Sequence, residues 1–149
     1  MASVRGASHV ALDVTDLAAS IAFYEVALGL DIFLDQRTDP QRPNIKGLIG
    51  GFAIELAQDA ARPAPRDRVG GHGGVVASPC VSLAISNASS AFAQLKAAGH
   101  VQAAAITEVQ GVKFFFVTDP DGHVFELIQF PQGLETLADL APLLRPARA

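Results

Sequence analysis

Two glutamates in strand-forming, largely apolar surroundings are the first residues in this sequence that could do chemistry. Glu126 lies in the stretch HVFELIQF, and Glu55 lies in the similar stretch GFAIELAQ. Removing an unpaired carboxylate from water costs several kcal/mol, so such a group either faces solvent or is held by a cation or a proton. A divalent cation would offset the desolvation of both carboxylates and would stabilise charge that develops on a bound substrate.

The two glutamates occupy equivalent positions of an internal repeat. The segment HVALDVTDLAASIAFYEVALG, from His9, is similar to CVSLAISNASSAFAQLKAAG, from Cys80, at an offset of 71 residues (80 minus 9). Glu55 and Glu126 are separated by the same 71 residues (126 minus 55). Because strand side chains alternate between faces, equal spacing within each copy predicts equivalent groups on equivalent faces of two related sheets. Four groups could then converge.

Each copy of the repeat predicts one strand, one helix and three further strands. In the first copy, residues 8–14 alternate as in a half-buried strand, Asp16 can cap a helix and Gly29 can end it. In the second copy, Asn87 and Gly99 have these capping roles, and Asp119-Pro120-Asp121-Gly122 is a hairpin turn. The later strands are expected at about 30–35, 45–49 and 52–58, and at about 101–107, 112–118 and 123–130.

Composition predicts a compact chain that is one domain spanning residues 1–149. Its two modules cover about 7–58 and 79–130, joined by a proline- and glycine-rich linker at 59–78. A tail at 131–149 follows, in which residues 134–144 could form a short helix.

Charge and apolar patterning narrow the expected partners and location. The net charge is -4 without a cluster of lysine and arginine, which argues against nucleic acid and anionic membranes and favours a small-molecule substrate. The sequence shows neither a long apolar span nor a secretory signal, and its single cysteine cannot form an internal disulfide. We therefore expect a soluble, cytoplasmic protein.

The sequence resembles the vicinal oxygen chelate superfamily, the glyoxalase, bleomycin-resistance and extradiol dioxygenase group. HVALDVTDLAASIAFYEVALGL is similar to the opening motif of that superfamily, and FVTDPDGHVFELIQF is similar to its closing motif. The resemblance covers residues 7–130. It implies an α+β fold, in which two tandem βαβββ modules form an open, curved mixed β-sheet cleft with flanking helices. It also implies a homodimer, with or without exchange of modules. Fold alone does not name the reaction.

The resemblance also implies a metal site. In metal-using members each module provides one ligand from its first strand and one from its last, which here are His9 and Glu55, and Cys80 and Glu126. Cys80 stands where these proteins most often have histidine, although a thiolate can bind zinc or iron. The expected cofactor is a divalent ion of nickel, zinc, manganese or iron.

The leading hypothesis is a metal-dependent lyase or isomerase resembling lactoylglutathione lyase, acting on a small substrate with adjacent oxygens. The metal would stabilise an enediolate, and Glu126, with Glu55 as the symmetric candidate, would transfer a proton. Three cationic side chains could anchor an anionic substrate group, although each is also typical of a solvated surface: Arg37, Lys46 and Lys113.

Two alternatives remain open. An extradiol ring-cleaving dioxygenase needs two histidines and a carboxylate around iron(II), and Cys80 takes the place of one histidine. A metal-free small-molecule binding or resistance protein would instead pair Glu55 and Glu126 with water, arginine or lysine. In that case His9 is an ordinary strand histidine and Cys80 a small buried apolar residue.

Overall fold

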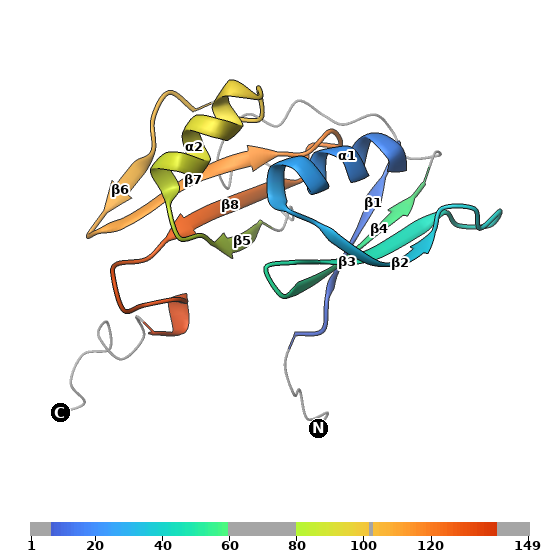
Figure 1. Cartoon of the computed structure of the whole chain (residues 1–149), viewed down its shortest axis with the longest axis horizontal. Helices are drawn as coiled ribbons and strands as arrows, with labels where there is room; N and C mark the ends of the chain where they lie inside the picture. Colours follow the sequence, from blue (N-terminus) through green and yellow to red (C-terminus); the bar gives the residue numbers. More distant parts are fainter. Residues whose placement is uncertain (1–6, 60–79, 102, 140–149) are drawn as a thin grey trace. The chain divides into compact units, whose positions relative to one another are not determined.

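The computed structural model describes residues 7–59, 80–101 and 103–139. They form an α+β fold with two open, four-stranded mixed sheets, each accompanied by a helix (Figure 1). Contacts divide the chain into unit 1, residues 1–66 with 119–122, and unit 2, residues 67–118 with 123–149. The predicted fold class and the repeated strand, helix and three-strand plan are confirmed.

Unit 1 holds the first copy of the repeat. Its elements are β1 (Val10–Val14), α1 (Leu17–Leu28), β2 (Asp31–Gln36), β3 (Asn44–Ile49) and β4 (Phe52–Gln58). The strand order is β1-β4-β3-β2, in which β1 and β4 are parallel and the other neighbours antiparallel.

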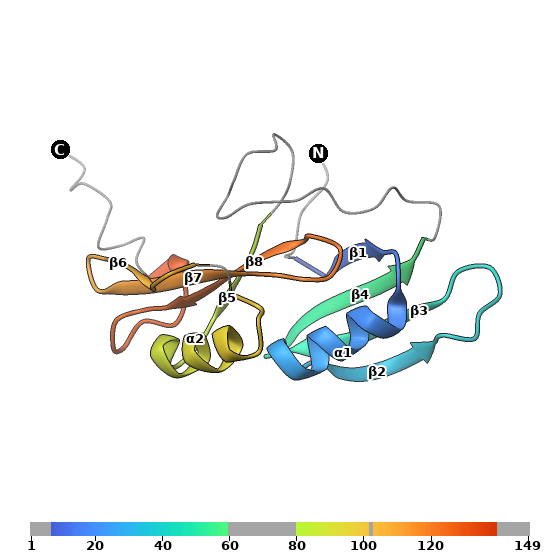
Figure 2. The ribbon, with the colours of Figure 1, turned by 90° about the horizontal axis from the view of Figure 1, so that it is seen from above.

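One face of the unit 1 sheet packs on α1 and forms the core. Leu12, Ile54 and Leu56 alternate inward along their strands and are buried, and α1 contacts β4 (Figure 2). The helix begins where the Asp16 side chain accepts a hydrogen bond from the backbone of Ala19. Ala11, Lys46 and Glu55 lie on the opposite face of the sheet.

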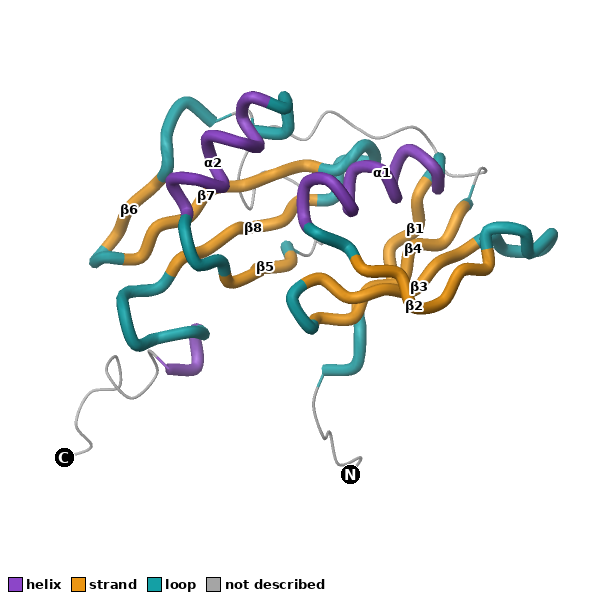
Figure 3. Tube along the Cα trace, in the orientation of Figure 1, coloured by secondary structure: helices purple, strands orange, loops and turns teal. Residues whose placement is uncertain are grey.

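Unit 2 repeats this plan. Its elements are β5 (Val81–Ala84), α2 (Ala88–Ala97), β6 (Thr107–Val109), β7 (Val112–Thr118) and β8 (Val124–Gln129), in the order β5-β8-β7-β6 (Figure 3). Phe115, Phe125 and Leu127 are buried on the helix-covered face, and Phe92 of α2 meets Phe115 edge to face at 5.2 Å between ring centroids.

The predicted strand at 101–107 is wrong, because β6 begins only at Thr107. The described residues before it include the exposed run of Ala103, Ala104 and Ala105, which offers no alternation of apolar and polar side chains. The Lys96 ammonium donates hydrogen bonds to the carbonyls of Ala103 and Ala104, so a side chain takes acceptors that a strand would pair.

The predicted linker, the predicted tail and the short helix predicted within that tail lie partly outside the described residues. Most of the linker at 59–78 lies there, as do residues 140–149 of the tail. The described part of the predicted tail helix is helical at 137–139. None of the helices within the described ranges is long and apolar enough to cross a membrane.

The predicted turn at 119–122 joins β7 to β8 and belongs to unit 1, where it carries two carboxylates onto α1. The Tyr24 hydroxyl donates to Asp119 Oδ2 at 2.8 Å, and Thr15 donates to Asp121 from its backbone and, at 2.6 Å, from its hydroxyl. Burial of Tyr24 raises the pKa of its hydroxyl, and the charge of Asp119 raises it further. Tyr24 therefore stays protonated and remains a donor.

These polar contacts are not repeated in the second copy. The Ser20 hydroxyl also donates to Asp121 Oδ2, at 3.4 Å. The residues 71 positions after Thr15, Ser20 and Tyr24 are Ser86, Ala91 and Leu95, and the last two have no polar side-chain atom. The contact with an acidic turn is therefore specific to α1.

We expect Tyr24→Phe to lower the free energy of unfolding by about 1–3 kcal/mol, because the buried Asp119 carboxylate loses a hydrogen-bond donor. Urea denaturation at pH 7 measures this. Ser89→Ala, at an exposed position of α2, is the control and should leave the free energy unchanged. Equal values for Tyr24→Phe and wild type would contradict the stabilising role of this hydrogen bond.

Candidate functional site

In unit 1, three chemically active side chains meet on the sheet face opposite α1. Glu55 on β4 lies directly between Ala11 on β1 and Lys46 on β3, and His9 immediately precedes β1. Glu55 Oε2 is 3.8 Å from His9 Nε2 and 3.7 Å from Lys46 Nζ. The Glu55 side chain is only 16% exposed, so a mostly buried carboxylate faces one permanent cation and one imidazole.

In unit 2, the equivalent glutamate has different neighbours. Glu126 on β8 lies between Ser82 on β5 and Phe116 on β7, and Ser82 Oγ donates a 2.6 Å hydrogen bond to Glu126 Oε2. Phe114 lies on the same face as Phe116, and their rings meet edge to face with centroids 5.9 Å apart. Glu126 therefore has a hydroxyl on one side and an aromatic wall on the other.

Cys80 immediately precedes β5 and is half-buried in unit 2. Burial raises the pKa of its thiol, and the negative charge of Glu126 raises it further, while a backbone hydrogen bond at Glu126 acts in the opposite direction. Cys80 is therefore a neutral thiol at pH 7 and would have to lose a proton to bind a metal.

The structure thus brings the predicted ligands together in two pairs, His9 with Glu55 in unit 1 and Cys80 beside Glu126 in unit 2. In the described part of the chain, no three His, Cys, Asp or Glu side chains gather as a metal-binding group. The set of four stays a prediction.

The other cations named from the sequence have partners of their own. Arg37 pairs with Asp35 two residues away, and Lys113 Nζ lies 3.8 Å from Glu108 Oε2. Of the three, Lys46 is the one that pairs with a candidate site residue, Glu55.

Ser82 is a candidate site residue that the sequence did not indicate. It lies two positions after Cys80, so strand alternation places it on the same face, and its repeat counterpart is Ala11. Its pairing with Glu126 depends on the register of β5 and β8. Strand alternation after Cys80 could have indicated the face on which Ser82 lies, whereas its pairing with Glu126 could not be predicted from alternation.

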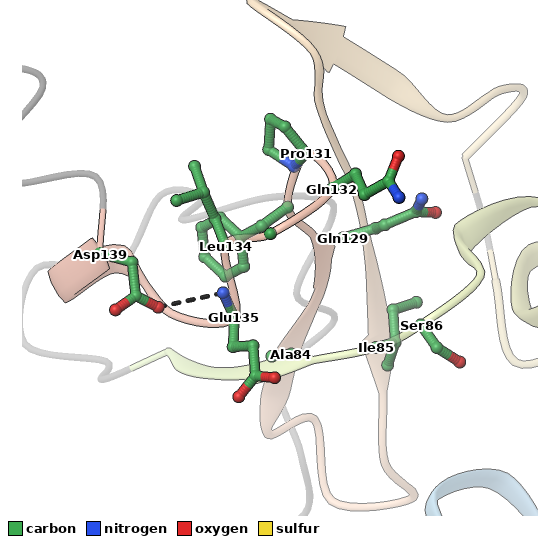
Figure 4. A pocket seen from close by; sticks show the side chains of 11 residues that line it. Ala84, Ile85, Ser86, Gln129, Pro131, Gln132, Leu134, Glu135 and Asp139 are labelled. Carbon is green, nitrogen blue, oxygen red and sulfur yellow. Dashed lines mark hydrogen bonds between the residues drawn. The ribbon is translucent and has the colours of Figure 1, made fainter.

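A separate hollow of about 700 Å³ lies at the ends of β5 and β8 in unit 2 (Figure 4). Its polar groups stabilise local structure: Gln129 accepts a hydrogen bond from the first backbone N–H of α2, and Asp139 accepts from the backbone of Glu135 and Thr136. None of the four predicted ligands lines the hollow. We therefore place the candidate chemistry on the sheet faces that carry Glu55 and Glu126.

Comparison with known protein families gives one match. Residues 6–127 match the sequence profile described as the glyoxalase/bleomycin resistance protein/dioxygenase superfamily. No curated protein sequence matches the chain significantly.

Solved structures similar to this chain include a glyoxylase/bleomycin resistance protein/dioxygenase domain from Frankia sp. EAN1pec. The identity is 22%, the TM-score is 0.68, and the match covers 89% of this chain and 96% of that one. A glutamate-to-glutamine mutant of a fosfomycin resistance protein, FosX, from Listeria monocytogenes, complexed with Mn(II) and 1S,2S-dihydroxypropylphosphonic acid, gives 20% identity and a TM-score of 0.68, covering 87% and 95%. FosX from Mesorhizobium loti gives 19% and 0.64, covering 96% and 100%. At these identities the likeness establishes the fold.

We expect the Cys80 thiol to react slowly with iodoacetamide at pH 8 in chelator-treated protein, and Glu126→Gln to accelerate the reaction about two- to threefold. Removing the Glu126 charge lowers the pKa of Cys80 and raises the fraction of thiolate. Mass spectrometry of the alkylated peptide against time gives the rate. Glu108→Gln, an exposed carboxylate of unit 2, is the matched control. An unchanged rate in Glu126→Gln would contradict the proximity of Cys80 and Glu126.

Proposed function

Because the chain belongs to the glyoxalase/bleomycin resistance protein/dioxygenase superfamily, we propose that it is a metal-dependent lyase or isomerase of the lactoylglutathione lyase type. Its substrate is a small molecule with two adjacent oxygen atoms. The observation that carries this proposal is the contact of His9 Nε2 with Glu55 Oε2 at 3.8 Å, on the sheet face left open by α1.

The donor chemistry fits a divalent transition metal. Imidazole nitrogen, carboxylate oxygen and thiolate sulfur are the ligand atoms that zinc, nickel, iron and manganese sites draw on. His9 and Glu55 already place two such donors side by side, and unit 2 offers Cys80 and Glu126 at the equivalent positions. We therefore propose His9, Glu55, Cys80 and Glu126 as the residues that hold the metal.

Each residue then has a role in the reaction. When bound, the metal supplies polarisation of the two substrate oxygens. Glu126 would remove a proton from one oxygen-bearing carbon and return it to the other, while the hydroxyl proton of the first carbon passes to the oxygen of the second. The substrate is thus isomerised without a further reactant. Glu55 is the symmetric candidate for this transfer.

One similar structure supports the choice of substrate class. The Listeria monocytogenes FosX structure contains Mn(II) with a dihydroxypropylphosphonic acid, and that compound has hydroxyl groups on adjacent carbons. These ligands belong to that protein. They support, for this chain, a divalent metal and a substrate with adjacent oxygens.

A second candidate function is a metal-free small-molecule binding protein of the resistance type. The observation that favours it is Lys46, whose ammonium lies 3.7 Å from Glu55 and can balance the carboxylate without a metal. No observation favours the extradiol dioxygenase, because Cys80 stands where a second histidine is needed.

Calorimetric titration with nickel and zinc distinguishes the two candidates. For a metal enzyme, we expect Cys80→His to raise metal affinity, since histidine supplies a better-matched fourth ligand, and Glu126→Gln to lower it at least about tenfold. Circular dichroism confirms that each variant is folded. Weak, indistinguishable binding by wild type and both variants would reject the metal enzyme and favour the binding protein.

Lys46→Met provides an independent prediction for the metal at Glu55. The ammonium competes with a metal for the same carboxylate, so its removal should raise zinc affinity about threefold or more. Lys113→Met is the matched control, because Lys113 pairs with Glu108 and should leave zinc affinity unchanged. A fall in zinc affinity in Lys46→Met alone would contradict competition at Glu55.

A further inference from the structure

The environment of Glu126 shows how a single side chain can direct this carboxylate. Ser82 and Phe116 flank it in register on the two neighbouring strands, β5 and β7. Phe116 has no hydrogen-bond donor on its side chain, whereas Ser82 donates to Glu126 Oε2 at 2.6 Å. The carboxylate is therefore held on the β5 side of its strand.

The geometry points to Ser82 as a positioning residue, which fixes the Glu126 carboxylate for metal binding and proton transfer. This inference rests on the proposed function. A glutamate side chain has several rotatable bonds, and a short hydrogen bond to an ionised oxygen is among the stronger contacts that can restrict them. Oε2 accepts the hydrogen bond from Ser82, which leaves Oε1, the oxygen without this donor, for proton transfer.

The internal repeat supports a role specific to Glu126. Ala11 pairs with Glu55 just as Ser82 pairs with Glu126, and alanine cannot donate a side-chain hydrogen bond. Glu55 is instead flanked by the ammonium of Lys46 and the imidazole of His9. The two equivalent glutamates are thus held by different chemistry, ion pairing for Glu55 and a hydroxyl for Glu126.

The first test measures the hydrogen bond in metal-free protein. The difference in infrared absorption between wild type and Glu126→Gln isolates the Glu126 carboxylate bands. We expect Ser82→Ala to shift these bands and Ser82→Thr, which keeps the hydroxyl, to restore them. Ser89→Ala, at an exposed position of α2, should leave them unchanged. Identical Glu126 bands in Ser82→Ala and wild type would overturn the inference.

The second test measures cobalt(II) binding and the visible spectrum of the bound cobalt. Outer partners of metal ligands typically contribute about 10- to 100-fold in affinity, so we expect Ser82→Ala to bind cobalt about tenfold more weakly, with an altered spectrum. Ser82→Thr should return both to the wild-type values, which a loss of folding alone would not predict. Wild-type affinity and spectrum in Ser82→Ala would overturn the inference.

The two tests separate this inference from the proposed function. If wild type binds no cobalt, the metal enzyme is rejected, and the infrared bands of metal-free protein still decide whether Ser82 holds Glu126. If wild type binds cobalt and Ser82→Ala behaves identically in both tests, the proposed function stands and the positioning role fails.

Discussion

In both units, one helix packs on one face of a four-stranded sheet, and the opposite face carries the candidate site residues. The alternation of strand side chains enforces this division, because a residue that packs on the helix cannot also contribute to the opposite face. In unit 1, Ile54 and Leu56 point to the core, and Glu55 between them must point away from it. In unit 2, Phe125 and Leu127 impose the same direction on Glu126. The position of both carboxylates follows from the packing of their apolar neighbours.

The repeat fixes where the two glutamates lie but leaves their surroundings free to differ. Each glutamate lies on a strand that is paired on both sides. The residues opposite it on the two neighbouring strands therefore determine its contacts. Glu55 lies between Ala11, which has no polar side-chain atom, and Lys46, whose ammonium is a cationic neighbour. Glu126 lies between the hydroxyl of Ser82 and the aromatic ring of Phe116. Proteins give chemically identical carboxylates different roles by placing them in different environments.

The sequence predicts the fold well because the signals that define it are local. Caps such as Asp16 and Asn87 and the turn at 119–122 lie where they were expected, since a few neighbouring residues determine them. The predicted strand at 101–107 is wrong because the alanines at 103–105 show no alternation of apolar and polar side chains. Site contacts were harder to predict: the pairing of Ser82 with Glu126 and of Lys46 with Glu55 depends on register between strands. Register is set by the whole sheet and by its turns, which no single motif encodes.

The acidic turn at 119–122 lies late in the sequence but forms hydrogen bonds with residues of the first copy. Thr15 and Asp121 are 106 residues apart, and Tyr24 and Asp119 are 95 apart. On the ribosome, α1 is synthesised long before its hydrogen-bonding partners, because chains emerge from the N-terminus first. The polar contacts of Thr15 and Tyr24 can therefore form only after most of the second copy has been synthesised. Such distant pairings slow folding, because loop closure precedes the gain from the contact. The duplicated sequence is consequently not two independently completed folding units.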